Sequence, residues 1–264
     1  MMDGAAMAKA AAAAHEAKKK AADADAKRFF TRPASEPQVF SLECIPMTCD
    51  APKEEVGLGL IGGPWFAGLL RKTTYDCAMD WCCGTGLFGM SLGYVSVVKK
   101  GVFVDISKER LDFIKGVHEP LNPGCTFLAD CDIIEADGVE KLAATGKYKF
   151  DLIAGSPPWF DGEDDKAIAD LGVDQHHSDS RFFINPNGRL YLELLETLEQ
   201  LSAGTTEVCF FGVDMEARFP ELVGQAKISE GAKKQIMDSL VIELGPGPPG
   251  NNIRSVYFVY KTGL

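Results

Sequence analysis

From Tyr75 to the C-terminus, short apolar or β-branched runs alternate with helix-like segments, and this alternation is the strongest constraint on the fold. Segments such as "SKERLDFIKGV" and "GRLYLELLETLEQL" separate the earlier runs, whereas no helix separates the last two. Strands that alternate with helices form a parallel sheet, and two adjacent strands without a helix form an antiparallel hairpin. The sequence therefore predicts an α/β, doubly wound, Rossmann-like fold with a mostly parallel seven-stranded sheet and a C-terminal antiparallel hairpin. The runs expected as strands are "CAMDWC", "GVFVDI", "CTFLAD", "FDLIAGS", "TEVCFFGV", "SLVIEL" and "SVYFVY".

The chain divides into three segments by composition. Residues 1–28 form an Ala/Lys-rich tract without large apolar residues, which is typical of a flexible tail or a frayed helix. Residues 29–74 carry scattered Pro, Gly and aromatic residues and end in "GGPWFAGLLRK", where Trp65 and Phe66 are expected either in the core or against a ligand. Residues 75–264 form the predicted sheet domain. The cysteines lie mostly in apolar runs and not at zinc-ligand spacing, which favours reduced thiols and no metal site.

The net charge of the chain restricts its partners. The formal charge is −11 with a pI near 4.9, and most of the excess lies after Asp151. This is the wrong sign for a protein that binds by neutralising phosphates, so nucleic acid is disfavoured. No run approaches the roughly 18 to 20 apolar residues of a membrane span, and no targeting segment is recognised at the N-terminus. We therefore expect a cytoplasmic protein without a membrane partner.

The first predicted strand runs into "DWCCGTGLFG", which contains Asp80, Cys82, Gly84 and Gly86. Glycines at the carboxyl end of such a strand let a ligand approach the backbone closely. Asp105 ends the next strand at a spacing that suits a ribose. Because Asp80 would repel a pyrophosphate but suits an ammonium and a sulfonium, the pattern favours S-adenosyl-L-methionine over a dinucleotide.

The motifs "DWCCGTG", "VDIS", "ADCD" and "SPPW", in this order, resemble the class I S-adenosylmethionine-dependent methyltransferases over about Tyr75 to Tyr260. Within that family the chain is most similar to the branch with an Asn/Asp/Ser-Pro-Pro-aromatic motif, which includes glutamine and exocyclic-amino methyltransferases. Cys82 replaces the usual first glycine, and Ser156 stands where Asn is usual. The resemblance implies that Asp80, Gly84 and Gly86 hold the methionine part, Asp105 the ribose, and Asp130 with Cys131 the adenine edge. Cys82 and Ile106 are the further candidate cofactor-binding residues.

The candidate catalytic residues are Ser156, Pro157, Pro158 and Trp159, which follow the apolar run "FDLIAG". Proline restricts its own φ and the residue before it, so the serine hydroxyl and nearby carbonyls are expected to be preorganised acceptors. Such acceptors can bind the hydrogens of an amide or amino nitrogen and steer its lone pair. Trp159 offers a flat face for stacking.

An acidic stretch follows Trp159 and is expected to be a substrate lid or a solvated loop. Its negative charge would favour an amine-bearing substrate. His176 and His177 are candidates for relaying a proton, and Arg181 is a candidate for holding a carboxylate.

The leading hypothesis is N-methylation of an amide, amine or amino-heterocycle, with a protein glutamine or a small metabolite favoured as acceptor. Two alternatives remain open: an exocyclic-amino base methyltransferase acting on RNA or DNA, and a non-catalytic binding partner that retains the fold. Each acid also has a structural alternative, since Asp80 can cap a helix and Asp105 can begin the helix at "SKERL".

Overall fold

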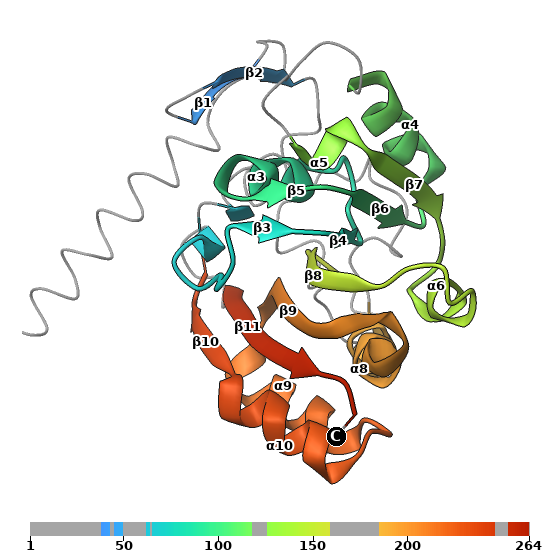
Figure 1. Cartoon of the computed structure of the whole chain (residues 1–264). Helices are drawn as coiled ribbons and strands as arrows, with labels where there is room; N and C mark the ends of the chain where they lie inside the picture. The colour runs from blue at the N-terminus through green and yellow to red at the C-terminus, as the bar shows by residue number, and fades with distance from the viewer. Residues whose placement is uncertain are drawn as a thin grey trace, which may run out of the picture.

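The computed structural model describes residues 38–42, 45–49, 62–63, 65–117, 126–158, 185–245 and 253–263. The sheet within them has seven strands in the order β10-β11-β9-β8-β4-β6-β7 (Figure 1). Their bounds are β4 (Ala78–Trp81), β6 (Gly101–Asp105), β7 (Cys131–Glu135), β8 (Phe150–Gly155), β9 (Ser202–Val213), β10 (Val241–Leu244) and β11 (Ile253–Lys261).

Five neighbouring strands, from β9 to β7, pair in parallel, and β11 alone runs against both of its neighbours. The predicted α/β fold with a mostly parallel sheet and a C-terminal antiparallel hairpin is therefore confirmed. The hairpin has one feature that the sequence pattern did not contain. Its second strand, β11, lies inside the sheet between β9 and β10, so β10 is the edge strand.

Helices cover both faces of the sheet, which is the reason why its strands are apolar on both sides (Figure 1). One core cluster joins the sheet to α6, α8, α9 and α10, and the other joins it to α3, α4 and α5. The bounds are α3 (Leu87–Val95), α4 (Lys108–Val117), α5 (Thr126–Ala129), α6 (Glu140–Ala144), α8 (Arg189–Leu201), α9 (Met215–Gln225) and α10 (Glu230–Ser239). The short elements are η2 (Pro186–Gly188) and the strand pairs β1 (Gln38–Leu42) with β2 (Ile45–Cys49) and β3 (Thr74–Tyr75) with β5 (Val97–Val98).

The strand that follows β6 in the sheet, β7, begins later in the sequence than predicted. The run "CTFLAD" was expected as a strand, but Thr126–Ala129 is helix α5, and the strand β7 begins at Cys131. Phe127 is fully buried and packs against Phe103 of β6, with ring centroids 4.9 Å apart. The apolar residues of this run therefore belong to α5 and pack into the core, because tertiary packing overrides local propensity.

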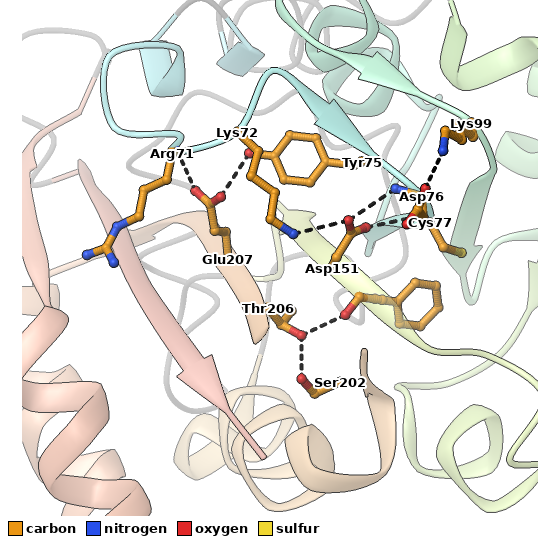
Figure 2. Close-up of polar contacts among 11 residues, drawn as sticks. Arg71, Lys72, Tyr75, Asp76, Cys77, Lys99, Asp151, Ser202, Thr206 and Glu207 are labelled. Atoms are coloured by element: carbon orange, nitrogen blue, oxygen red, sulfur yellow. Dashed lines mark hydrogen bonds and ion pairs between the residues drawn. The ribbon is translucent and has the colours of Figure 1, made fainter. Parts of the chain in front are cut away.

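Buried carboxylates hold the amino ends of the strands together (Figure 2). Glu207 of β9 accepts hydrogen bonds from the Arg71 amide at 2.7 Å, the Tyr75 hydroxyl at 3.1 Å and the Tyr257 hydroxyl at 2.8 Å. Asp151 of β8 accepts from the amides of Asp76 and Cys77. These contacts attach the segment before β4 to three other strands, and no expectation from the sequence anticipated them.

The lead-in segment also packs against the domain in its described part. Phe66 is fully buried, with its ring 5.1 Å from that of Phe211, so the core alternative holds for this residue. Trp65 is 40% exposed. The Gly63 amide donates to the Ser91 hydroxyl of α3 at 2.8 Å, and a Cβ at Gly63 would lie 2.1 Å from the Ser91 carbonyl oxygen. Glycine is thus required where this segment crosses α3.

Candidate functional site

Three adjacent strands of the sheet end at the same level. Trp81, the last residue of β4, pairs with Val104 of β6 on one side and with Gly155 of β8 on the other. The segments that follow these strands therefore begin at one edge of the sheet. The chain passes from β4 to β6 on one side and later to β8 on the other, so this is the point where the strand order reverses. Ligands of open α/β sheets bind at such a point.

The loop between β4 and α3 is a tight, left-handed turn. Cys82, Gly84 and Gly86 have φ angles of 52°, 52° and 77°. A Cβ at Gly86 would lie 2.9 Å from the ring of Phe103, so this position requires glycine for its conformation and for its packing. Cys82 adopts the same conformation with a side chain, which is energetically unfavourable for a non-glycine residue. The position where the resemblance implies a glycine is therefore a strained one in this chain.

Asp80 is fully buried in β4 and bonds to helix α3. Its Oδ2 atom accepts a hydrogen bond from the Gly89 amide at 2.7 Å, so the helix-capping alternative is correct for one oxygen. A Cβ at Gly89 would lie 3.0 Å from that oxygen, and the glycine thus permits the contact. Among the described residues, the Oδ1 atom has no hydrogen-bond partner. A buried carboxylate oxygen without a partner is costly and marks a position where a donor would bind.

The electrostatics of this buried carboxyl group favour a cationic ligand. Burial raises the pKa of Asp80 well above its usual range, and the nearby charge of Asp105 raises it further. An ammonium or sulfonium group would offset both effects, because an opposite charge favours the ionised carboxylate. A phosphate would increase the repulsion.

Asp105 ends β6 and holds the glycine loop. Its Oδ2 atom accepts from the Gly84 amide at 2.7 Å and its Oδ1 atom from the Ser107 amide at 2.8 Å. Asp105 is 7% exposed, and Ile106 lies partly buried in the turn beside it. Ser107, rather than Asp105, precedes helix α4 and bonds to the Arg110 amide. Since a carboxylate oxygen accepts about two hydrogen bonds, each oxygen retains capacity for a hydroxyl group.

The structure does not bring Asp130 and Cys131 to this edge of the sheet. Cys131 pairs with Gly101, the first residue of β6, and the carbonyl oxygen of Asp130 accepts from the Gly101 amide at 2.8 Å. Both residues thus lie at the amino ends of the strands, opposite to Asp105. Their assignment to the adenine edge was wrong, because the strand was placed about five residues too early.

The segment at the carboxyl end of β7 is instead Ala136, Asp137 and Gly138. Glu135 pairs with Asp105, and the Ala136 amide donates to the carbonyl oxygen of Asp105 at 2.9 Å. The sequence did contain a signal for this segment. In "IIEADG", β-branched residues precede an acid and a glycine, which is the pattern of a strand followed by a turn.

Ser156, Pro157 and Pro158 directly follow β8 at the shared edge. Ser156 and Pro158 are partly exposed and Pro157 is buried. A Cβ at Gly155 would lie 2.4 Å from the carbonyl oxygen of Trp81, so this glycine allows β8 to approach β4 closely. Trp159, His176, His177, Arg181 and the acidic stretch lie outside the described residues.

The described residues contain neither a cluster of metal-ligating side chains nor a membrane-spanning helix. Within the described residues, no three His, Cys, Asp or Glu side chains lie close enough together to hold a metal ion. No helix in the same part of the chain is long and apolar enough to cross a bilayer.

Comparison with known proteins shows similarity only at the level of solved structures. No protein-family model matches the chain, and no curated protein matches it. An rRNA methylase from Streptococcus thermophilus is 14% identical, with a TM-score of 0.49 over 77% of this chain and 96% of that one. TrmN from Thermus thermophilus is 15% identical, with a TM-score of 0.45 over 75% of this chain and 48% of that one. SMU.776, described as a methyltransferase complexed with SAH, is 11% identical, with a TM-score of 0.47 over 82% of this chain and 52% of that one.

Proposed function

We propose that the protein is a methyltransferase that transfers a methyl group from S-adenosyl-L-methionine to a nitrogen of an amide, amine or amino-heterocycle. The observation that carries this proposal is the buried Asp80 carboxylate with an unpartnered oxygen, next to a left-handed glycine loop and Asp105. All three lie where the strand order of the sheet reverses.

The described residues fit the parts of this cofactor. Asp80 offers the free oxygen to the ammonium group, and Gly84 and Gly86 leave the backbone open beside it. Asp105 accepts the ribose hydroxyls with its remaining lone pairs. The loop at Ala136 to Gly138, which replaces Asp130 and Cys131 in this role, faces the base. When bound, S-adenosyl-L-methionine supplies a methyl group activated by its sulfonium.

Ser156 and the carbonyl groups beside Pro157 and Pro158 are the proposed acceptors for the hydrogens of the target nitrogen. They follow β8, which is in register with β4, so the acceptor segment and the glycine loop begin at neighbouring positions. The prolines restrict the backbone and reduce the entropy lost when the nitrogen is oriented. Trp159 is proposed to stack on the acceptor group.

A protein glutamine or a small metabolite is the favoured acceptor. The basic pairs Arg71–Lys72 and Lys99–Lys100 could contact a phosphate backbone, but they lie at the amino ends of the strands. Lys72 is paired with Asp151, and Lys99 is paired with Asp76. A base methyltransferase remains the alternative, which predicts nucleic-acid binding that weakens steeply with salt.

Calorimetry with S-adenosyl-L-methionine and S-adenosylhomocysteine tests the cofactor assignment. We expect binding by the full chain and its loss in Asp105→Ala, because the ribose loses its acceptor. Absence of binding by the natural chain would contradict the proposal and favour the non-catalytic alternative.

Incubation with methyl-labelled cofactor and fractionated cell extract tests the acceptor. We expect label in protein or in small molecules, and turnover lost but cofactor binding retained when Ser156→Ala and Trp159→Ala are combined. Label entering only RNA or DNA would support the base-methyltransferase alternative. Full turnover in the double variant would refute the assigned acceptor segment.

A further inference from the structure

A glutamate on helix α8 holds the loop that follows β7. The Oε1 atom of Glu193 accepts hydrogen bonds from the amides of Val139 and Glu140, both at 2.5 Å. Val139 is the N-cap of α6 and offers no side-chain cap of its own. Glu193 therefore supplies from another helix the acceptor that this helix start lacks.

The backbone conformation of Gly138 and its lack of a side chain leave room for this carboxylate. Its φ is +87°, and a Cβ at this position would lie 2.3 Å from both carboxylate oxygens of Glu193. The backbone of the loop thus lies directly against the carboxylate. The Glu193 side chain is 12% exposed, so water competes little for these hydrogen bonds.

Arg189, one turn earlier on α8, extends the contact to the next acid. Its Nη2 atom lies 2.6 Å from Oδ1 of Asp137, and its Nη1 atom lies 3.4 Å from Oε2 of Glu193. Asp137 and Arg189 are about half exposed, so this pair contributes less than the Glu193 contact.

The loop that Glu193 holds lies at the carboxyl ends of the strands, where the cofactor is proposed to bind. The Ala136 amide donates to the carbonyl oxygen of Asp105, and the Asp105 side chain holds the Gly84 amide. Tyr191 in the first turn of α8 also packs edge-on against Trp81, the last residue of β4, with ring centroids 6.0 Å apart. The first turn of α8 therefore contacts the loop after β7 and the strand that leads into the glycine loop.

We propose that Glu193 is a positioning residue for the cofactor: by fixing Gly138, Val139 and Glu140, it sets the wall against which the base binds. This inference rests on the proposed function. It assigns to α8, the next described α-helix after the Ser156 segment, a role in recognising the base rather than the acceptor.

The test measures the affinity of the full chain for S-adenosylhomocysteine in Glu193→Leu and Glu193→Gln. We expect Glu193→Leu to weaken binding about tenfold, whereas Glu193→Gln stays within about threefold of the natural chain because glutamine retains an acceptor oxygen. The matched control is Glu196→Leu on the same helix. Glu196 also accepts a backbone amide, from Lys227 at 2.9 Å, but Lys227 is not part of the loop after β7, so replacing Glu196 should leave the affinity unchanged.

A second ligand separates positioning from general damage to the fold. S-inosylhomocysteine differs only in the base, so loss of the base wall should reduce the preference for S-adenosylhomocysteine over it. A destabilised protein would weaken both ligands by the same factor. If Glu193→Leu does not fold, Glu193→Asp withdraws the carboxylate from the amides while keeping its charge, and the same loss of preference is expected.

The outcomes distinguish the two proposals. If the natural chain binds S-adenosylhomocysteine but Glu193→Leu, or Glu193→Asp in its place, keeps its affinity and its preference, the positioning role is wrong and the proposed function stands. If the natural chain does not bind S-adenosylhomocysteine, both are overturned.

Discussion

Two residues at the candidate site, one in the glycine loop and one in β4 before it, have features that cost stability. Cys82 occupies a left-handed conformation with φ of 52°, where the family resemblance expects glycine. Asp80 is buried with one oxygen unpartnered among the described residues. Both features reduce the stability of the ligand-free protein and are typical of functional sites.

Replacing Cys82 by glycine should change stability little. Glycine removes a left-handed strain of roughly 1 to 2 kcal/mol, which offsets the lost side-chain contacts and the greater freedom of the unfolded chain. We expect the free energy of unfolding in urea to stay within about 1 kcal/mol of the natural value. The control is Cys209→Gly in strand β9, where the thiol is fully buried, and which should cost more. Equal losses at both positions would contradict the strain argument.

The pH dependence of stability should report the buried Asp80. Because the pKa of Asp80 is raised in the folded state, the folded protein binds more protons than the unfolded chain above about pH 4. The stability of the natural chain should therefore fall as pH rises from that value toward the pKa of the folded state. Asp80→Asn keeps an acceptor for the Gly89 amide and removes this dependence.

Urea unfolding of both proteins between pH 4 and pH 8 measures the effect. We expect the variant to gain stability relative to the natural chain as pH rises. A difference that is constant across this range would show that Asp80 does not titrate abnormally.

At the scale of elements, the buried Glu207 joins β9 to β11 and to the segment before β4. It accepts from two tyrosine hydroxyls and one amide and is 2% exposed. Figure 2 shows its contacts with Arg71 and Tyr75. The pKa values of Tyr75 and Tyr257 are raised, chiefly by burial and also by Glu207, so both hydroxyls stay protonated and donate. These contacts fix the amino ends of the strands while the site lies at their carboxyl ends.

Glu207→Leu should destabilise the protein by about 3 kcal/mol or more, because three buried donors lose their acceptor. Glu207→Gln retains one oxygen and should cost about half as much. Glu199→Leu is the control, since Glu199 also accepts from a tyrosine, at 2.6 Å from the Tyr260 hydroxyl, but it is exposed and water can replace it. Chemical denaturation compares the three variants, and a loss at Glu207 no larger than at Glu199 would contradict the role of burial.

For the whole molecule, the net negative charge of the chain and the acidic residues of the candidate site act in the same direction. The chain carries a formal charge of −11, and the site itself contains two buried acids. A zwitterionic ligand with a sulfonium is compatible with this field, whereas a phosphate is repelled. The molecule should therefore distinguish S-adenosyl ligands from nucleotides that carry phosphates.

Thermal unfolding with added ligand tests this discrimination. S-adenosylhomocysteine at about 100 times its Kd should contribute roughly 2.7 kcal/mol, which raises the Tm of a domain of this size by about 5 to 10 °C. NAD at the same concentration should leave the Tm unchanged. A shift with NAD and none with S-adenosylhomocysteine would favour a dinucleotide-binding site instead.

The sequence by itself determined the layer architecture and the three motifs of the site. The alternation of strands and helices is a local, periodic signal, and it predicted the parallel sheet and the final hairpin. "DWCCGTG", Asp105 and "SPPW" each lie at the end of a strongly apolar strand, so their common edge was also predictable.

Only the tertiary structure decided the features that depend on packing between distant segments. It placed β7 about five residues later than local propensity indicated, because Phe127 of α5 packs against Phe103 and "CDIIE" pairs with β6. It inserted β11 between β9 and β10 and brought Glu193 of α8 against Gly138. Burial, register and contacts between elements arise from the whole chain and have no counterpart in local sequence, which is why these features could not be predicted from it.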